Sequence, residues 1–438
     1  MASKPPLHVT FPWEVLRAPG HERLARLVRV TRGEPVIRMV LGHRRFWLVS
    51  DVEGARHVLQ ENARAYKKSP TYDQLRPFLG NGLFTSEGDH WRRQRRLAQP
   101  AFHHKALVGM AEAMVAETEV LLANWSRRAG AGASFDVAAD MMQLTLSVVG
   151  RTLFSAQLAS RAGELGAALT TVLTLTERRL LNPLRIPEPV PTPQNLRYGA
   201  ALRRMDSIVR GLLAERRRGG GDAHDLLAML MAARDEETGE GMSDDQLRDE
   251  VMTLILAGHE TTANALSFTF ALLSQHPDVR RRLQDEVRTV LGGRAPTTAD
   301  LRQLPYTAAV VQEAMRLYPP VWMMERQALE ADELCGYRVE PGTVVLISPY
   351  LLHRLPAHWP NPEGFDPARF LEGGAERPKH AYLPFGAGPR VCIGNAFALM
   401  EAQIVVAMVA SRFELDVEAG HHLEPELMLV MRPRGGVP

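Results

Sequence analysis

The stretch FGAGPRVCIGNAFA, residues 385–398, places one of the chain's two cysteines in a glycine-rich segment just before an apolar helical pattern. Gly386, Gly388 and Gly394 allow backbone conformations and close approaches that larger residues resist. A helix that begins after Cys392 would direct its N-terminal dipole and free N–H groups at the sulfur, and both effects stabilise a thiolate. The segment therefore suggests a metal-binding or reactive cysteine.

Three other interpretations of Cys392 stay open on this segment alone. A single cysteine near a helix start is often a small core residue. Val391 stands where a dinucleotide-binding loop would need its third glycine, and no strand–helix–strand unit surrounds the segment, so such a loop is disfavoured. A catalytic cysteine nucleophile would need a histidine partner, which the spacing does not exclude.

Composition favours a single globular domain over residues 1–438. Apolar residues make up 45% of the 438 residues, charged residues 23%, and the net charge is +2. This balance gives no reason to expect nucleic-acid binding. No apolar run is long enough to span a bilayer, and the N-terminus lacks an apolar signal core. We therefore expect a cytoplasmic protein with no membrane span, in which Cys335 and Cys392 stay reduced.

The first two hundred residues combine strand, loop and helix signals. The pattern predicts a strand at 44–51, a helix at 51–62 capped by Asp51, and a long loop at 70–86 that is rich in turn-forming residues. Residues 88–235 are mostly helical, with breaks at the proline-rich segment 183–193 and at 216–225.

A long helix is predicted to start at Ser243 and to end before His276-Pro277. Ser243 and Gln246 have the spacing of a capping box, and the apolar middle of this helix suggests that it crosses the core. Residues 328–350 alternate like paired strands around a Pro341-Gly342 turn, and residues 394–412 form another apolar helix.

The cysteine segment resembles the cytochrome P450 signature Phe-x-x-Gly-x-Arg-x-Cys-x-Gly, whose positions are filled by Phe385, Gly388, Arg390, Cys392 and Gly394. The resemblance implies the cytochrome P450 fold, mainly α with a smaller β portion, with the haem between a long central helix and the cysteine-bearing loop. The cofactor would be haem b, with Cys392 as thiolate ligand of the iron, an arrangement that favours O–O cleavage. Phe385, Gly386 and Gly394 would contact the haem, and Arg390 would pair with a propionate.

The motif AGHETT, residues 257–262 of the long helix, resembles the oxygen-activating motif of the same family. Ala257 and Gly258 would lie over the haem, where the glycine leaves room for dioxygen. Thr261 can bond back to its own helix. Glu260 and Thr261 would act as the catalytic pair that delivers protons, and a carboxylate at this apolar position would be costly without such a use or a partner.

Three further motifs appear in the family's order. EAMR (313–316) and PARF (367–370) imply a structural triad of Glu313, Arg316 and Arg369. WRRQR (91–95) implies that Trp91 and Arg95 reach a propionate, and Arg326 is another propionate candidate by its position. The neighbouring Arg92, Arg93 and Arg96 are expected to face solvent and to offer a basic docking surface to an acidic electron donor.

Substrate-pocket residues are inferred from family position only: Leu83, Phe84, Leu256, Val321, Trp322, Met323, Met428 and Leu429. The lining is apolar and predicts a hydrophobic substrate, such as a terpenoid, steroid, carotenoid or fatty acid. Each of these residues could equally be ordinary core. The chain looks most similar to soluble bacterial family members related to carotenoid and fatty-acid hydroxylases.

The expected activity is monooxygenation, which hydroxylates or epoxidises the substrate with dioxygen and two external electrons. We expect no fused reductase domain. The electrons would come from a separate ferredoxin or flavodoxin with its NAD(P)H-dependent reductase, and the enzyme would be a monomer. Two alternatives are a peroxide-driven haem-thiolate peroxygenase and a non-catalytic haem sensor or carrier, although a sensor has no need of Glu260 and Thr261.

Overall fold

Helices dominate the molecule, as the sequence predicts. The computed structural model describes the whole chain apart from residues 1–6, 10–19, 32, 42–43, 132, 155–161, 182–186, 188, 220–224 and 372–375. The described helices are α2 (Gly20–Thr31), α3 (Val52–Arg56), α4 (Arg76–Leu79), α5 (Gly88–Ala98), α6 (His104–Gly130), α7 (Val137–Phe154), α8 (Ala162–Leu181), α9 (Pro193–Arg217), α10 (Leu226–Ala232), α11 (Asp244–Gln275), α12 (Pro277–Leu291), α13 (Pro305–Leu317), α14 (Pro349–Leu352) and α15 (Asn395–Ala410).

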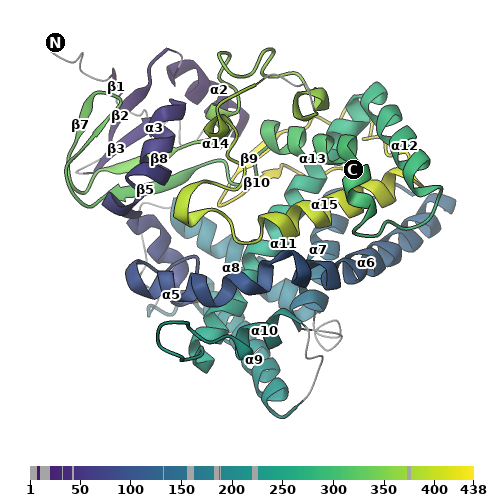
Figure 1. The fold of residues 1–438 in the computed structure, drawn as a ribbon, viewed down its shortest axis with the longest axis horizontal. Helices are drawn as coiled ribbons and strands as arrows, with labels where there is room; N and C mark the ends of the chain where they lie inside the picture. The colour runs from purple at the N-terminus through teal and green to yellow at the C-terminus, as the bar shows by residue number, and fades with distance from the viewer. Residues whose placement is uncertain are drawn as a thin grey trace.

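Strands form a smaller region at one side of the molecule (Figure 1). The main sheet has six strands in the order β1-β2-β3-β8-β5-β4. Two two-stranded sheets pair β6 with β7 and β9 with β10. The strands are β1 (Leu7–Val9), β2 (Val36–Leu41), β3 (Arg44–Val49), β4 (Tyr66–Lys68), β5 (Met324–Ala328), β6 (Asp332–Leu334), β7 (Tyr337–Val339), β8 (Val344–Ile347), β9 (Pro425–Leu427) and β10 (Met431–Pro433).

Helix α11 crosses the centre of the helical region, and its predicted ends are confirmed. Ser243 and Gln246 form the capping box, in which each side chain bonds to the other residue's backbone. The helix has 32 residues, a length of about 48 Å at 1.5 Å per residue, and it ends before His276 and Pro277. Most of its surface is buried against α7, α13 and α15, so it is the axis around which the helical core is built.

Helix α15 follows the cysteine segment and also runs through the core. In Figure 1 it lies in front of α11, and the two helices contact each other directly. Ile404, Val405, Val406 and Ala407 are completely buried. An apolar helix of this kind fixes the position of the loop that precedes it.

Two local predictions need correction or refinement. Asp51 caps α3 as expected, but the helix changes to a π-helical turn at His57–Glu61 instead of continuing regularly to residue 62. The loop predicted at 70–86 is wrong in its first half, because Pro70–Leu75 forms a 3-10 helix and α4 follows at once. Proline occupies the first or second position of both short helices, where its missing N–H costs nothing.

Strand β3 confirms the strand at 44–51. Strands do occur within 328–350, but the predicted pairing around Pro341-Gly342 is wrong, because β7 before this turn pairs with β6 and β8 after it pairs with β3 and β5. Helices α5 to α10 account for the helical region after residue 88. The breaks at 183–193 and 216–225 lie partly outside the described residues, and their described parts agree with α9, which begins at Pro193 and ends at Arg217. No helix among the described residues is long and apolar enough to cross a membrane.

A buried ion pair ties α13 to the segment that leads to Cys392. Arg316 and Glu313 are both fully buried, and Arg316 donates to both carboxylate oxygens of Glu313, at 2.7 and 2.8 Å. Arg369 adds a 3.3 Å contact to the same carboxylate, so the three side chains of the predicted triad do meet. Arg316 also donates to the backbone carbonyls of His353, Pro362 and Gly364.

Replacement of Glu313 by Gln should destabilise the protein strongly. The variant leaves the buried guanidinium of Arg316 without its counter-charge, which typically costs about 3–5 kcal/mol. Urea unfolding, followed by circular dichroism, should show this loss, whereas Glu340→Gln, which removes an exposed carboxylate paired with Arg338, should change stability by less than about 1 kcal/mol. Equal unfolding midpoints for the two variants would contradict the central role of the pair.

Candidate functional site

The cysteine loop is shaped by two glycines and by its contact with the π-helical turn. Gly386 and Gly388 have positive φ angles of 71° and 67°. A Cβ atom on Gly388 would lie 1.8 Å from the Leu59 carbonyl oxygen, so no other residue fits there. The Cys392 N–H donates to the Phe385 carbonyl at 2.9 Å and closes the loop. The backbone thus holds the cysteine in a fixed position at the start of α15.

The groups around the Cys392 sulfur have opposite effects on the pKa of its thiol. Both cysteines are free thiols, and the Cys392 side chain is exposed. The dense protein around the loop raises the pKa of the Cys392 thiol, whereas the Gly394 N–H and the Arg95 guanidinium lower it. Arg95 is anchored here, because it donates to the Val391 carbonyl at 2.9 Å. The loop therefore offers an accessible sulfur whose anionic form is favoured by one N–H and one cation.

Helix α11 presents the AGHETT motif in the middle of the core. Ala257 is exposed although Leu256, His259 and Glu260 beside it are buried, so protein leaves open space on this side of the helix. The Thr261 hydroxyl donates to the Ala257 carbonyl at 2.5 Å, the back-bond that the sequence predicts. Thr261 is half-buried and lies one turn from Ala257, so both border the open side.

Gly258 has a packing role in addition to its expected one. A Cβ atom on Gly258 would lie 2.9 Å from a methyl carbon of Val149 on α7. The glycine therefore allows α7 to lie close against α11. That it also leaves room for dioxygen stays a prediction.

Lys68, Arg326 and Arg390 lie close enough to affect one another electrostatically, with the Glu87 carboxylate among them. Arg390 lies 4.1 Å from the centre of the Trp91 ring, donates to the Ser86 carbonyl at 2.9 Å and pairs with Glu87. The pKa of Arg390 is lowered to about 10, mainly by burial and also by the charge of Arg326, while the Glu87 carboxylate acts in the opposite direction. Lys68 has a pKa well below its usual value, first because of burial and then because of Arg326 and Arg390.

This excess of positive charge fits an anionic group of the cofactor. Buried like charges repel one another, and Glu87 compensates only part of the field. A haem carries two propionates, and three converging cations are a suitable site for them. Trp91, Arg95, Arg326 and Arg390, which the sequence analysis associates with the propionates, all lie in or beside this cluster. Lys68 and Glu87 were missed, because no motif distinguishes Lys68 from its exposed neighbour Lys67.

The predicted pocket residues are only partly brought together. The Trp322 indole N–H donates to the Met428 carbonyl at 3.0 Å, which joins two of the predicted segments. Val321, Trp322 and Met323 pack into three different apolar clusters, and Phe84 and Leu429 pack against the main helical core. Leu83 and Leu256 are each 9% exposed. Their assignment to the substrate pocket therefore stays a prediction.

The arginines considered for docking mostly have partners within the chain. Arg92 pairs with Asp89, and Arg93 donates to the Gly241 carbonyl. Arg96 contacts Asp235 and Glu237, each at 2.9 Å. Only part of the positive charge of α5 is therefore left for an electron donor.

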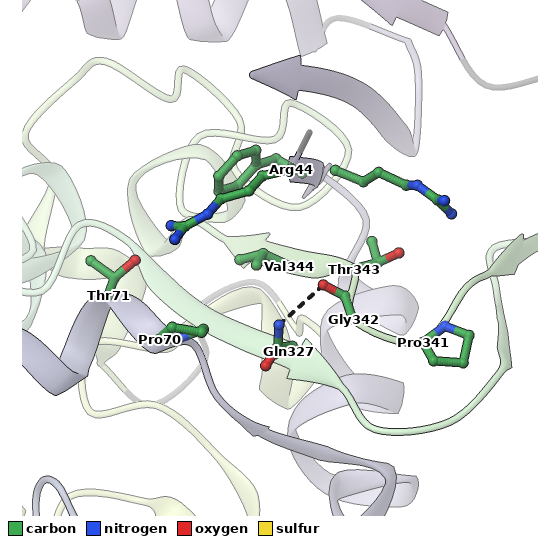
Figure 2. A pocket seen from close by; sticks show the side chains of 10 residues that line it. Arg44, Pro70, Thr71, Gln327, Pro341, Gly342, Thr343 and Val344 are labelled. Atoms are coloured by element: carbon green, nitrogen blue, oxygen red, sulfur yellow. Dashed lines mark hydrogen bonds between the residues drawn. The ribbon is translucent and has the colours of Figure 1, made fainter. Parts of the chain in front are cut away.

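A groove of about 370 Å³ lies away from these residues, at one end of the central strands of the main sheet. Figure 2 shows its lining, in which the Gln327 side chain donates to the Gly342 carbonyl at 3.2 Å. Its walls come from the starts of β3 and β8 and from the turn at Pro341-Gly342. None of the predicted site residues lines it, so it is separate from the candidate active site.

Comparisons with known proteins agree with this geometry. The family model for cytochrome P450 matches residues 4–437. Cyclooctatin synthase of Streptomyces melanosporofaciens is 41% identical over 89% of this chain and 85% of its own length. Cyclooctat-9-en-7-ol 5-monooxygenase of the same organism is 40% identical over 87% and 82%. The crystal structure of the cytochrome P450DA heme domain superposes with a TM-score of 0.90 at 30% identity, covering 99% of this chain and 96% of its own.

Fold and site together define a haem-thiolate oxygenase. The chain belongs to the cytochrome P450 family and is a monooxygenase that carries haem with a cysteine thiolate ligand and acts on a hydrophobic small molecule with the help of redox partners.

Replacement of Lys68 by Met should weaken haem retention, because it removes one of the cations that face the propionates. A hydrogen bond to a charged group contributes roughly 1.5–3 kcal/mol, so haem transfer to apomyoglobin should become about tenfold faster or more. Lys67→Met, at the exposed neighbouring position, is the matched control and should transfer haem at the wild-type rate. Identical rates for both variants would remove Lys68 from the propionate site.

Proposed function

We propose that the Cys392 thiolate would hold the haem iron and that the open side of α11 at Ala257 would border the space in which dioxygen and substrate bind. The single observation that carries this proposal is an accessible thiol, held rigidly by Gly386 and Gly388 at the start of α15. When bound, the haem supplies the binding and reductive activation of dioxygen. The protein supplies position, charge and protons.

The propionates would be held by Lys68, Arg326 and Arg390, with Trp91 stacked against Arg390 and Arg95 nearby. Arg95 has a second function in this proposal, because its charge favours the thiolate of Cys392. Phe385, Gly386 and Gly394 would contact the haem from the cysteine side, where their small or flat surfaces leave space for the porphyrin.

Glu260 and Thr261 would move the protons that the reaction consumes. The Thr261 hydroxyl proton is engaged by the Ala257 carbonyl, so its oxygen remains a hydrogen-bond acceptor toward the open side of the helix. Glu260 is buried one position before it on the same helix. We propose that Glu260 resupplies the proton that Thr261 passes on.

The proposed substrate is a terpenoid, which is hydroxylated or epoxidised at a carbon that this chain does not identify. Support comes from the apolar residues that surround the predicted pocket and from the two Streptomyces relatives, one of which is by its name a monooxygenase of an unsaturated alcohol. The electrons would come from a separate ferredoxin or flavodoxin and its NAD(P)H-dependent reductase. The family model already takes up residues 4–437, which form one catalytic domain in this proposal. We expect a monomer that works in the cytoplasm, where NAD(P)H is available.

The carbon monoxide spectrum of the reduced protein tests the ligand. Wild type should show the strongly red-shifted Soret band of a thiolate-ligated haem, and Cys392→Ala should lose it. Cys335→Ala is the control and should keep the wild-type spectrum, because Cys335 lies in the turn between β6 and β7. A histidine-type spectrum of the wild-type protein would overturn the proposal.

The proton-delivery role predicts uncoupling in Thr261→Ala. With a terpenoid that shifts the Soret band of the protein, this variant should consume NADPH at a similar rate but release most of the electrons as hydrogen peroxide, since general acid catalysis typically contributes about 10²–10⁴-fold. Thr269→Ala is a matched control, because Thr269 makes the same bond to the carbonyl four residues earlier, at 2.7 Å, in a fully buried position. Tight coupling in Thr261→Ala would contradict the role. Turnover with peroxide alone, and none with redox partners, would favour a peroxygenase.

A further inference from the structure

The segment between α4 and α5, residues 80–87, is fastened to helix α11 by two consecutive carboxylates. Asp249 accepts the Asn81 N–H at 2.7 Å, and Glu250 accepts the Leu83 N–H at 3.0 Å. We call this segment loop 80–87. Glycines make the close approach possible: a Cβ atom on Gly82 would lie 2.4 Å from the Thr253 hydroxyl oxygen and 2.6 Å from the Asp249 carbonyl oxygen.

The two carboxylates differ in their surroundings. Asp249 also pairs with Arg248 at 2.9 Å, so its charge is compensated. Glu250 is 1% exposed, and its second oxygen has no hydrogen-bond partner among the described residues. The pKa of Glu250 is raised to about 8: burial is the main cause, the charge of Asp249 adds to it, and the bond from the Leu83 N–H opposes it.

Charged groups on the neighbouring elements are occupied elsewhere. Helix α4 brings Arg76, which bonds to Asp73, to the Asn81 side chain and to the Thr85 carbonyl. Helix α9 brings Asp206, which contacts Arg248 and Arg210. The protonation of Glu250 is therefore controlled mainly by its burial and by loop 80–87 itself.

The far end of loop 80–87 is bonded to the cations of the candidate active site. The Phe84 carbonyl accepts from Lys68, the Ser86 carbonyl accepts from Arg390, and the Glu87 carboxylate pairs with Arg390. The Glu87 carboxylate also accepts the Lys68 backbone N–H at 3.0 Å. A single short loop thus connects α11 to two of the three cations.

Between these two attachments lie Leu83 and Phe84. We propose that Glu250 is a positioning residue of the oxygenase: by accepting the Leu83 N–H it holds loop 80–87 where Leu83 and Phe84 border the substrate pocket. The same loop then fixes Lys68 and Arg390 for the cofactor. This inference rests on the proposed function for the assignment of the pocket and of the propionate site.

The test compares two azoles that bind the haem iron of the holoenzyme through the same nitrogen, imidazole and the triphenylmethyl-substituted clotrimazole. Imidazole needs only access to the iron, whereas clotrimazole also contacts the pocket walls. In Glu250→Leu, which removes the acceptor, clotrimazole affinity should change by about tenfold while imidazole affinity stays within about twofold, because the buried Leu83 N–H loses its hydrogen-bond partner. Asp245→Asn is the control: it removes an exposed carboxylate from the same helix, and both affinities should stay at wild-type values.

The conservative variant and the pH dependence separate positioning from a merely structural effect. Glu250→Gln keeps an acceptor oxygen of similar shape and should restore wild-type clotrimazole binding near pH 7, where Glu250 is mostly protonated. As the pH rises through about 8, the wild-type carboxyl ionises and accepts the Leu83 N–H more strongly. Imidazole itself is partly protonated near pH 7, so both affinities are expressed for the neutral azole. The ratio of clotrimazole to imidazole affinity should then change between about pH 7 and about pH 9 in wild type and stay constant in Glu250→Gln.

Equal changes for both azoles in Glu250→Leu, or a ratio in wild type that is independent of pH, would overturn the inference. The pH series uses wild type and Glu250→Gln only, so it decides the question even if Glu250→Leu does not fold. The carbon monoxide spectrum keeps the two proposals apart. A thiolate spectrum combined with unaltered azole selectivity would reject the role of Glu250 alone, whereas a histidine-type spectrum would reject the proposed function.

Discussion

The buried pair of Glu313 and Arg316 is the interaction on which the position of the cysteine loop depends. Besides their own contact, its two members take part in backbone bonds to a segment that runs from His353 to Asp366. His353 extends the connection, because its ring accepts the Leu383 N–H at 2.8 Å, two residues before Phe385. Burial lowers the pKa of His353 to about 3, so the ring is neutral and can accept this bond. An unbroken series of hydrogen bonds therefore runs from the middle of α13 to the start of the cysteine loop.

The cations near Glu87 differ from Arg316 in how far their charge is compensated. Arg316 has its counter-charge in Glu313, whereas Lys68 and Arg390 share the Glu87 carboxylate and are also affected by the positive charge of Arg326. Such a cluster is unfavourable in the protein alone, and an anionic ligand removes the repulsion. Because a ligand that binds only the folded state stabilises it by mass action, cofactor binding and folding are coupled most strongly at this cluster. The pair of Glu313 and Arg316 thus positions the cysteine loop through bonds within the chain, whereas the cations near Glu87 would be stabilised by an anionic ligand.

The sequence predicts those features of the fold and the site that depend on residues close together in the chain or on motifs of fixed spacing. The capping box of Ser243 and Gln246, the glycines of the cysteine loop and the Glu313–Arg316–Arg369 contact follow from residues a few positions apart or from motifs of fixed spacing. Lys68 and Glu250 could not be predicted in this way, since each acquires its role from a partner far along the chain. The helical turns after Pro70 were missed for a related reason, because proline is typical both of loops and of the first turn of a short helix.

Glu250 differs from the buried carboxyl groups Glu313 and Glu401 in the contacts that its side chain makes. Glu313 is held by arginines, whereas neither Glu250 nor Glu401 has a cation partner among the described residues, and burial raises the pKa of both carboxyls. Glu401 lies inside α15 and its carboxyl oxygens have no hydrogen-bond partner there, so its protonation changes no described contact. Glu250 holds the Leu83 N–H, and the same loop carries the carbonyls that Lys68 and Arg390 bind. A change in the charge of Glu250 is therefore transmitted to both the pocket wall and the cofactor site, which is the physical basis for its positioning role.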